Sequence, residues 1–249
     1  MTPRREEFPQ RRVDGAQRTP SIAVIVPVLN EAAGIGECVT EVVRRQDVDE
    51  IVVVDGHSAD GTAAAARGAL HGVAGAAVIG SPRGRAAQMN AGAARAQSDV
   101  VLFLHADTRL PAGAAGEVRR CVRGGAIWGR FDVRLNGEHR GYRVIERAMN
   151  LRSRISGIAT GDQCMFVRRS TFVDVGGFAD IALMEDIEIS KRLKRLARPA
   201  RITSPAETST RRWEARGVLR TVALMWWLRA RYFLGADPQR LAARYHGAR

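Results

Sequence analysis

The segment SIAVIVPVLNE (residues 21–31) begins with an uninterrupted run of apolar residues, most of them β-branched, and ends in polar ones. A run of this length and composition predicts a strand that is buried on both faces of a sheet. The next segment, residues 30–46, has Ile35, Val39 and Val42 at the spacing of one helix face, so a helix is expected there. The chain is therefore expected to open with a buried strand followed by an amphipathic helix.

The same alternation continues along the first half of the chain. Apolar runs predict further strands, and capped or alanine-rich segments predict the helices between them. The strands are expected at residues 50–55, 76–80 and 99–107, and the helices at residues 59–70, 84–97 and 110–123. Such alternation predicts an α/β fold with a mostly parallel sheet and helices on both faces.

Beyond about residue 125 the pattern is less regular. Residues 126–135 alternate like a strand, and residues 138–154 and 185–197 have helical spacing. Residues 214–249 are expected to form a basic helical tail with an apolar centre. Residues 1–20 combine mixed charges and prolines without an apolar leader segment, so a disordered tail and no secretory signal are expected.

Composition narrows the class of protein. The chain has 249 residues, of which 45% are hydrophobic, enough for one large domain or two small ones. No run of about 18 apolar residues is present, so no membrane span is expected. Cys38, Cys121 and Cys164 are far apart and form no CxxC motif. We therefore expect reduced core cysteines in a cytoplasmic protein, and neither a disulfide framework nor a zinc site.

The formal net charge of +13 comes almost wholly from arginine, because only two lysines are present. Abundant arginine, alanine and glycine are typical of a GC-rich genome, so this charge does not by itself indicate a nucleic-acid partner. The position of the charge is more informative. Residues 211–249 contain nine arginines and two acids, and a basic tail of this kind favours an anionic surface or substrate.

Polar residues stand at the carboxyl end of each predicted strand. They occur in PVLNE (27–31), DGHSADGT (55–62), SPRGRAAQMN (81–90) and HAD (105–107). Each segment alone is ordinary turn chemistry. Ligands of open α/β sheets bind at this edge, so four such segments in order favour one shared nucleotide site.

Together these segments resemble the nucleotide-binding half of the family 2 glycosyltransferases, the large inverting group with the Rossmann-like GT-A fold. The resemblance covers about residues 20–213 and is nearest to a bacterial subgroup described as rSAM/selenodomain-associated transferase 2, itself similar to carotenoid-acid glucosyltransferases. It implies a GT-A domain over residues 21–213, with a nucleotide-binding half at 21–110 and an acceptor half at 125–213. It also implies a nucleotide-sugar donor, with a UDP-sugar expected.

The resemblance assigns the residues at the strand ends to the donor. These are Pro27, Asn30, Glu31, Asp55, Ser58, Arg85, Gln88, Asn90 and Asp107. Asp55 can accept a hydrogen bond from the imide N–H of uracil, and Pro27 and Glu31 would shape the base and ribose pocket. Arg85, entering a helix, would place a cation and free N–H groups near a diphosphate. A solvated helix-face position is the alternative for Arg85.

Members of the family usually carry Asp-x-Asp at the end of the fourth strand, where this chain has His105-Ala106-Asp107. Asp107 is therefore the expected ligand of a Mg²⁺ or Mn²⁺ ion that bridges the diphosphate oxygens. Two interpretations of His105 stay open. It could add a nitrogen ligand, which would favour Mn²⁺, or it could pack in place and bond to the ribose.

The segment TGDQCMFVRRSTFVDVGGFAD (160–180) resembles the acceptor side of the family, where it leads to a Glu-Asp motif, here Glu185-Asp186. In the family the Asp is the general base that takes the proton of the acceptor hydroxyl. Acids at a helix start are also favoured by about 0.3–1 kcal/mol without any catalysis, which is the alternative explanation. The other acceptor-side candidates are Gly161, Asp162, Gln163, Arg212 and Trp213, followed by Arg130, Asp132, Arg152 and Arg154.

Two features of the C-terminal region bear on the acceptor. STRRWE (209–214) is similar to the Gln-x-x-Arg-Trp motif of processive members, but Ser209 replaces the Gln, so polymer synthesis is not expected. Residues 218–235 combine Trp226, Trp227 and Phe233 with flanking arginines, which suits a helix at a membrane interface and a lipid-like acceptor at the inner face of the cell membrane. A helix packed on the domain or in a dimer contact is the alternative, and the oligomeric state stays open.

Two other functions are considered. A sugar-phosphate nucleotidyltransferase would carry a glycine-rich loop with arginine where this chain has PVLNEAAGIG. A non-catalytic basic module that binds nucleotides or membranes would not need Asp55, Asp107 and Asp186 at strand ends. The sequence therefore predicts an inverting, metal-dependent hexosyltransferase with a small-molecule or lipid-like acceptor and no nucleic-acid partner.

Overall fold

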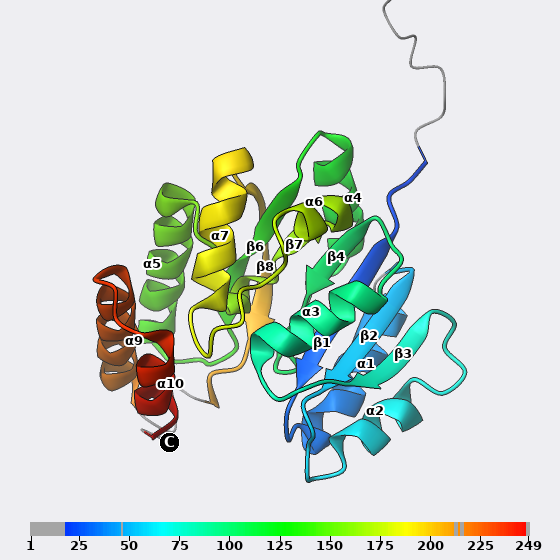
Figure 1. Cartoon of the computed structure of the whole chain (residues 1–249), viewed down its shortest axis with the longest axis horizontal. Helices are drawn as coiled ribbons and strands as arrows, with labels where there is room; N and C mark the ends of the chain where they lie inside the picture. The colour runs from blue at the N-terminus through cyan, green and yellow to red at the C-terminus, as the bar shows by residue number, and fades with distance from the viewer. Residues whose placement is uncertain (1–17, 46, 212–213, 215–216, 248–249) are drawn as a thin grey trace, which may run out of the picture.

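The computed structural model describes residues 18–45, 47–211, 214 and 217–247. Within these residues a single eight-stranded sheet runs through the molecule, and helices cover both of its faces (Figure 1). The predicted α/β architecture is thereby confirmed. The disordered tail predicted for residues 1–20 falls almost wholly outside the described residues. At their start, Arg18 forms an ion pair of 2.7 Å with Asp99.

The first half of the sheet is parallel, as predicted. Its strands are β1 (Ile22–Val28), β2 (Glu50–Asp55), β3 (Ala76–Gly80) and β4 (Val100–Phe103). β1 lies between β2 and β4, and β3 follows on the outer side of β2. The helices between them are α1 (Ala32–Arg45), α2 (Thr62–Ala69) and α3 (Arg85–Arg95). The prediction for residues 99–107 is wrong at its end, because β4 stops at Phe103 and the chain leaves the sheet there.

The second half of the sheet is mixed. Its strands are β5 (Thr108–Arg109), β6 (Trp128–Leu135), β7 (Phe166–Arg168) and β8 (Ala200–Thr208). β7 is antiparallel to both β4 and β6, β8 runs parallel to β6, and β5 pairs antiparallel with β8. The strand order is therefore β3-β2-β1-β4-β7-β6-β8-β5. β7 joins the two halves at the middle of the sheet.

The sequence pattern does not predict β8. Pro205 lies inside it, and a proline cannot donate the N–H that an inner strand needs. The pairing register shifts at this place, since Phe131 and Val133 of β6 face Ile202 and Ala206 of β8. Pro205 thus falls in a bulge, where the missing N–H costs little.

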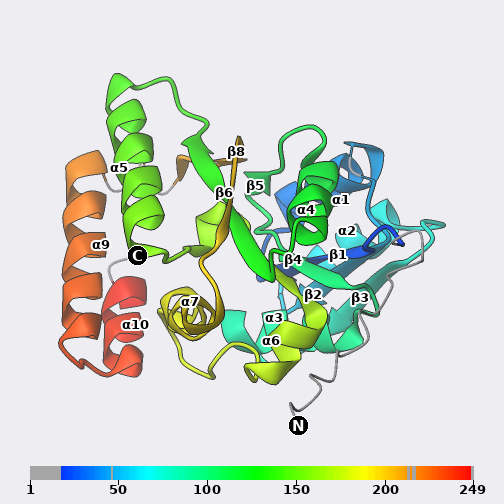
Figure 2. The ribbon, with the colours of Figure 1, turned by 90° about the horizontal axis from the view of Figure 1, so that it is seen from above.

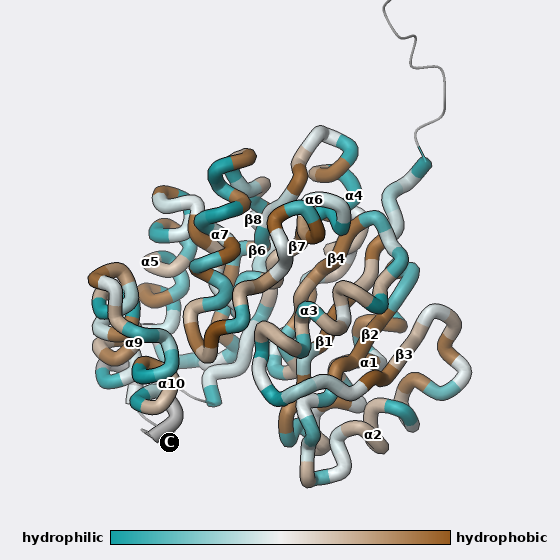
Figure 3. Tube along the Cα trace, in the orientation of Figure 1, coloured by the Kyte–Doolittle hydropathy of each residue, from teal (hydrophilic) through white to brown (hydrophobic). Residues whose placement is uncertain are grey.

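The remaining helices pack on the two faces of the sheet. They are α4 (Ala114–Arg123), α5 (Arg140–Ser156), the 3₁₀ turn η1 (Gly161–Gln163), α6 (Arg169–Asp174) and α7 (Glu185–Leu196). Alternate residues of β1 supply two cores: Ile22 and Val24 face α1, α2 and α4, whereas Ala23 and Ile25 face α3, α6 and α7. The hydrophobic parts of the trace accordingly gather along the central strands (Figure 3).

Two C-terminal helices, α9 (Val218–Phe233) and α10 (Pro238–Gly247), pack beside α5 and α7 (Figures 1 and 2). Leu228, with no exposed surface, and Leu241 join Ile187 of α7 in a third apolar cluster. One face of α9 is therefore packed on the domain. The opposite face leaves Trp226 59% and Phe233 58% exposed. Among the described residues, no helix has the length and apolarity that crossing a membrane requires.

All three cysteines are free thiols, as expected. Cys38 and Cys164 are buried in the core, while Cys121 is only partly buried. The division of the chain at residues 110, 125 and 213 stays a prediction.

Candidate active site

A small cleft lies where β4 ends and α7 begins. Four of the predicted site residues line it: Arg85, Gly161, Glu185 and Asp186. Its other lining residues are Met89, Phe103, His105, Thr160, Met165 and Phe178. The structure therefore brings the acidic pair of α7 together with the arginine that begins α3, although about a hundred residues of chain separate them.

Glu185 is the buried member of the acidic pair. The chain turns sharply before α7, with Met184 in the left-handed region at φ 72°, and Glu185 is only 4% exposed. A guanidinium nitrogen of Arg85 lies 3.8 Å from its carboxylate. Burial and the negative charge of Asp186 raise the pKa of Glu185 to about 7, against the opposing effect of Arg85. Glu185 is thus able to hold a proton near neutral pH.

Asp186 is fixed from two sides. Its Oδ2 accepts a hydrogen bond of 2.9 Å from the N–H of Gly161, and its Oδ1 accepts one of 2.7 Å from the N–H of Ile187. Gly161 has no room for a side chain, because a Cβ there would lie 2.4 Å from Cε1 of His105. The close approach of His105 and Gly161 therefore sets the position of the N–H that holds Asp186.

Asp55 is the last residue of β2, and one of its carboxylate oxygens has no hydrogen-bond partner among the described residues. Its Oδ2 accepts a hydrogen bond of 3.1 Å from the N–H of Ser58. Its Oδ1 is buried and has no hydrogen-bond partner among the described residues. A buried acceptor without a partner is costly, so this oxygen is suited to receive an N–H from a ligand. The observation fits the role predicted for Asp55.

Asn30 and Glu31 belong to a loop that is hydrogen-bonded to the loop after β2. Asn30, at φ 55°, donates its N–H to Oγ of Ser58 and accepts the N–H of Ala59 through its side chain, both at 2.9 Å. The N–H of Glu31 donates to Oγ1 of Thr62 at 2.8 Å. These contacts hold the two loops as one wall at the carboxyl edge of the sheet.

Gln88 and Asn90 of α3 are engaged with backbone groups. Nε2 of Gln88 donates to the carbonyl oxygens of Val28 and Val54, at 2.7 and 2.9 Å. Asn90 exchanges two hydrogen bonds with the backbone of Phe178, of 2.8 and 2.9 Å. Both side chains thus support the walls of the site, and their contact with the donor stays a prediction.

Pro27 lies just beyond the last hydrogen bond between β1 and β4, which joins the N–H of Leu104 to the oxygen of Ile25 at 2.9 Å. A proline is tolerated there because no neighbouring strand requires its N–H. Pro27 is therefore placed on the edge where the two strands diverge.

The predicted acceptor-side residues have different surroundings. Asp162 lies with a carboxylate oxygen 3.9 Å from Nδ1 of His105. Gln163 is fully buried, with its Oε1 accepting the N–H of Thr160 at 3.2 Å, and its Nε2 has no partner among the described residues. Gln163 thus shapes the turn from inside and does not face the cleft surface. Arg212 and Trp213 lie outside the described residues.

Arg130 and Asp132, two further candidates, form a buried ion-pair network. Arg130 contacts Asp132 at 2.6 Å, and the same carboxylate accepts Arg201 at 2.5 Å. Burial alone would raise the pKa of Asp132, but the hydrogen bonds from Arg201 and Arg130 outweigh it and leave that pKa below its usual value. The two side chains thus bind each other and Arg201, and their contact with the acceptor stays a prediction.

Arg229 of α9 is a site-proximal residue that sequence reasoning missed. Burial lowers its pKa, while the charges of Asp186 and Asp162 oppose that effect. The sequence offered no signal for it, because an arginine beside an apolar run looks like a flanking cation of an interfacial helix. Glu188, in the first turn of the same helix as the acidic pair, forms an i,i+4 ion pair with Arg192.

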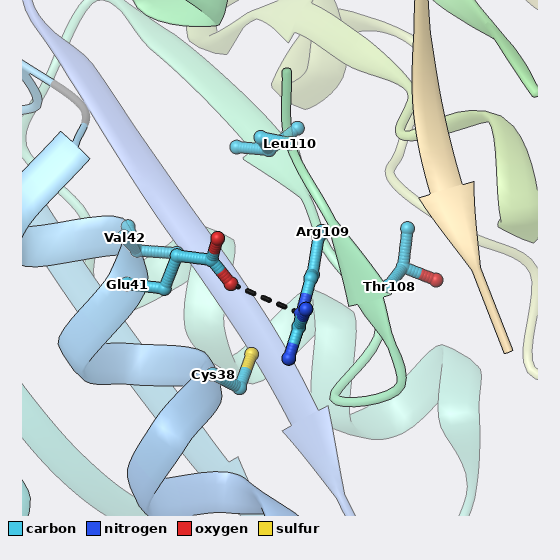
Figure 4. A pocket seen from close by; sticks show the side chains of 6 residues that line it. All are labelled: Cys38, Glu41, Val42, Thr108, Arg109 and Leu110. Atoms are coloured by element: carbon cyan, nitrogen blue, oxygen red, sulfur yellow. Dashed lines mark ion pairs between the residues drawn. The ribbon is translucent and has the colours of Figure 1, made fainter. Parts of the chain in front are cut away.

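A second, small pocket lies between α1 and β5, away from the acidic pair (Figure 4). Arg109 reaches across it to Glu41 at 3.2 Å, beside the thiol of Cys38. Burial, followed by the charge of Glu41, raises the pKa of Cys38 to about 12. The thiol is therefore protonated and unreactive, and this pocket has the character of a helix–strand contact.

The comparison with family models matches residues 23–175 to the model described as "Glycosyl transferase family 2". The chain belongs to glycosyl transferase family 2. The matched stretch runs from β1 to the end of α6 and includes Asp55, Arg85 and Gly161, whereas the acidic pair lies just beyond it. The comparison with curated proteins found no match.

Solved structures show that this family 2 chain has the GT-A fold that the sequence predicted. TarS of S. aureus (residues 1–349) matches with a TM-score of 0.63 and 17% identity, over 76% of this chain and 60% of that one. The mannosyltransferase PcManGT from Pyrobaculum calidifontis, in complex with GDP-Man and Mn²⁺, matches with a TM-score of 0.58 and 23% identity, over 78% and 57%. Glucosyl-3-phosphoglycerate synthase from Mycobacterium tuberculosis, with Mg²⁺ and UDP, matches with a TM-score of 0.56 and 18% identity, over 76% and 71%.

The family 2 chain thus spans about 60% of the first of these relatives. Its candidate metal ligand, Asp107, lies exposed at the turn into β5. Among the described residues, the carboxylate accepts a single long contact of 3.4 Å from Oγ1 of Thr108, and its backbone oxygen accepts the N–H of Ser209 at 3.0 Å. No three acidic, histidine or cysteine side chains among the described residues converge to hold a metal. One open carboxylate fits an ion that takes most of its ligands from a diphosphate and water.

Proposed function

We propose that this chain transfers a sugar, with inversion, from a nucleotide-sugar to a hydroxyl or carboxylate of an acceptor. The observation that carries the proposal is the placement of Asp186, which two backbone N–H groups hold at the wall of the cleft beside Glu185 and Arg85. Fixing a carboxylate from two sides leaves it one orientation, which is what a general base requires.

The donor proposed is a UDP-sugar. The unpartnered buried oxygen of Asp55 supports a base that offers a ring N–H, as uracil does. Arg85, at the start of α3, supports a place for the diphosphate between that loop and the acidic pair. Among the solved relatives, TarS is described in complex with UDP-GlcNAc and the synthase with UDP, while the mannosyltransferase carries GDP-Man. The nature of the sugar follows from none of these contacts.

Asp107 would hold a Mg²⁺ or Mn²⁺ ion together with the diphosphate. When bound, such an ion offsets the negative charge that develops on the leaving nucleoside diphosphate. His105 lies buried against Gly161 and next to Asp162. That position supports the interpretation in which His105 packs and orients its neighbours.

The chemistry proposed for the chain's own residues is a single displacement. The acceptor oxygen forms a bond to the anomeric carbon while the bond from that carbon to the diphosphate breaks, and the configuration inverts. Asp186 takes the proton of an acceptor hydroxyl as this happens. Arg85 faces the leaving diphosphate, and Glu185 keeps Arg85 aligned across the 3.8 Å contact. A placed base contributes roughly 10² to 10⁴ in rate.

For the acceptor, we propose a lipid-like molecule such as a carotenoid acid, presented at the inner face of the cell membrane. The exposed aromatic residues Trp226, Trp227 and Phe233 of α9 support peripheral contact with lipid, and Arg244 lies 4.7 Å from the ring of Trp227. A helix that packs on one face and exposes aromatics and arginines on the other suits a membrane interface. The motif resemblance supports a place in the rSAM/selenodomain-associated transferase 2 subgroup.

The decisive experiment is a donor screen with the purified chain. Calorimetry with UDP and with GDP, each with and without Mn²⁺, is expected to show tighter, metal-dependent binding of UDP. UDP-sugars that bind are then incubated with membrane extracts, and release of UDP and a glycosylated product are sought by mass spectrometry. Binding of UDP without turnover of any donor would favour the second candidate, a non-catalytic nucleotide-binding module. Absence of UDP and GDP binding would refute the proposal.

A further inference from the structure

Two arginines from neighbouring helices have no ion-pair partner among the described residues. Arg152 belongs to α5 and Arg229 to α9, helices that lie side by side in Figures 1 and 2. In the part of the chain that the structure describes, neither guanidinium comes within 4.0 Å of a carboxylate oxygen. Two cations on adjacent helices are therefore without a direct ion pair in this part of the chain.

Most of the hydrogen-bond donors of Arg152 have no partner among the described residues. Its Nε is buried and without a partner among the described residues. Its Nη2 makes a single long contact, 3.4 Å to Oγ1 of Thr160, a residue that lines the cleft. A guanidinium carries five N–H donors, so most of those on Arg152 are open to another group. Their orientation toward Thr160 brings them to the cleft wall.

Arg229 belongs to a helix that packs beside the acidic pair. Its neighbour Leu228 has no exposed surface and packs with Met184 and Ile187, the residues on either side of the acidic pair. The following residue, Arg229, is half-buried on this helix. Burial lowers the pKa of Arg229, and the charges of Asp186 and Asp162 oppose that effect.

The two arginines also act on each other. Burial, and next the positive charge of Arg229, lower the pKa of Arg152 to about 10, against the effect of Asp186. Keeping two like charges close in poorly solvated surroundings is unfavourable unless an anion joins them. Among the described residues Asp186 makes no direct ion pair with either arginine, and its oxygens accept the N–H groups of Gly161 and Ile187.

We propose that Arg152 and Arg229 form a subsite for an anionic group, a phosphate or a carboxylate, that the acceptor carries beside its reacting oxygen. This inference rests on the proposed function, since it takes Asp186 to face the acceptor. Guanidinium groups bind both kinds of oxyanion through paired N–H donors. An anion held here would fix the acceptor at one point, leaving its nucleophilic oxygen to turn toward Asp186. The C-terminal helix would then be part of the acceptor site itself.

The test uses small anions as probes. Inorganic phosphate and, in parallel, acetate are titrated by calorimetry into the full chain saturated with UDP and Mg²⁺. Arg152→Gln and Arg229→Gln are each expected to weaken binding of the preferred anion at least tenfold. Matched controls on the same helices, Arg147→Gln on α5 and Arg220→Gln on α9, are both exposed and are expected to bind the anion as the wild type does. UDP affinity is expected to stay within twofold in all four variants.

The outcomes separate the alternatives. Stronger binding of phosphate or of acetate identifies the anionic group, and either result supports the subsite. Wild-type anion affinity in both Gln variants would overturn it. A loss of UDP affinity in those variants would also overturn it, because the arginines would then serve the donor diphosphate. Arg152→Lys and Arg229→Lys keep the positive charge but lose the paired N–H donors of the guanidinium. They replace the Gln variants in the test if those fold poorly, and an anion affinity intermediate between wild type and complete loss is expected of them.

The same titration distinguishes this inference from the proposed function. If the wild-type chain binds no UDP, the proposed function fails. Anion binding in the absence of nucleotide, lost in the two Gln variants and kept in the controls, would then still establish the subsite.

Discussion

The N–H of Gly161 lies 2.9 Å from a carboxylate oxygen of Asp186. This bond ties the short turn η1 to the first turn of α7, two segments that the sequence separates by about twenty-five residues. Because Gly161 also lies against His105, the orientation of Asp186 depends on the end of β4. The acidic pair is therefore held by the donor half of the sheet as well as by its own helix.

With an acceptor that reacts through a hydroxyl, Asp186→Asn is expected to lower kcat by at least two orders of magnitude while UDP affinity stays nearly unchanged, because the amide cannot take the acceptor's proton. Steady-state assays of UDP release and calorimetry with UDP give the two quantities. The matched control is Asp180→Asn, an exposed acid in the loop before α7, which should leave both unchanged. If UDP affinity and kcat fall together, Asp186 has a structural role.

Gly161→Ala is expected to reduce kcat by roughly 10- to 100-fold, since a new Cβ would lie 2.4 Å from His105 and must displace the turn that holds Asp186. Gly116→Ala in α4 is the control, because nothing lies within 4 Å of a Cβ at that position. This control should keep full activity and gain about 1 kcal/mol of stability as a helix residue. An unimpaired Gly161→Ala enzyme would show that Asp186 does not need the bond.

The raised pKa of Glu185 predicts a pH dependence of stability. Its pKa moves from 4.5 in the unfolded chain to about 7 in the fold, so the folded protein binds the extra proton between these values. The free energy of unfolding of the ligand-free protein should therefore fall as pH rises through this window, by on the order of 2–3 kcal/mol. Urea unfolding from pH 4.5 to 8 measures this loss.

Glu185→Gln should remove most of that loss, because the amide does not titrate. Glu188→Gln, three residues along the same helix, is the control and should keep the wild-type slope. Identical pH profiles for wild type and Glu185→Gln would contradict the assignment of the titration to Glu185.

Asp107→Ala is expected to abolish the stimulation of UDP binding by Mn²⁺ while leaving metal-free UDP affinity nearly intact, because the carboxylate is the open oxygen ligand at the turn into β5. Calorimetry with UDP at increasing Mn²⁺ checks this. Asp174→Asn, an exposed acid at the end of α6, serves as the control. Undiminished metal dependence in Asp107→Ala would place the ion elsewhere.

Asp132→Asn is expected to destabilise the fold by about 3–5 kcal/mol, because it leaves the buried Arg130 without its partner. Arg130 is only 1% exposed and Asp132 only 6%. Asp47→Asn is the matched control: that acid pairs with Arg119 but its side chain is 94% exposed, so a loss below about 1 kcal/mol is expected. Equal losses in urea unfolding would mean that burial does not set the strength of these pairs.

The parallel half of the sheet could be predicted because each of its elements is specified locally. Continuous apolar runs and helical spacing identify β1 to β4 and their helices without any knowledge of tertiary contacts. β8 could not, since its Pro205 is acceptable only through the bulge opposite β6. The sequence cannot show which strand will face a proline.

For the site, the strand-end rule pointed to Asp55 and Arg85, because parallel strands bring their carboxyl ends to one edge, while the acidic pair was predicted from the family resemblance; the roles of these residues stay predictions. It could not separate groups that face the cleft from groups that hold its walls. Gln88 and Asn90 have the same chemistry as ligand-binding amides, and only their contacts with Val28, Val54 and Phe178 show their use. The position of Arg229 could not be predicted for a similar reason, because the packing of α9 on the domain depends on the apolar cluster around Leu228.

Helix α3 borders both the donor side and the acceptor side of the proposed site. Arg85 in its first turn faces Glu185. Asn90, further along the helix, forms two hydrogen bonds with the backbone of Phe178 in the loop that leads to the acidic pair. A displacement of this helix by an arriving nucleotide would shift that loop with it. Binding of the donor would then change the affinity for the acceptor. By thermodynamic linkage, binding of the acceptor would change the affinity for the donor by the same factor. One helix would thus couple the two affinities.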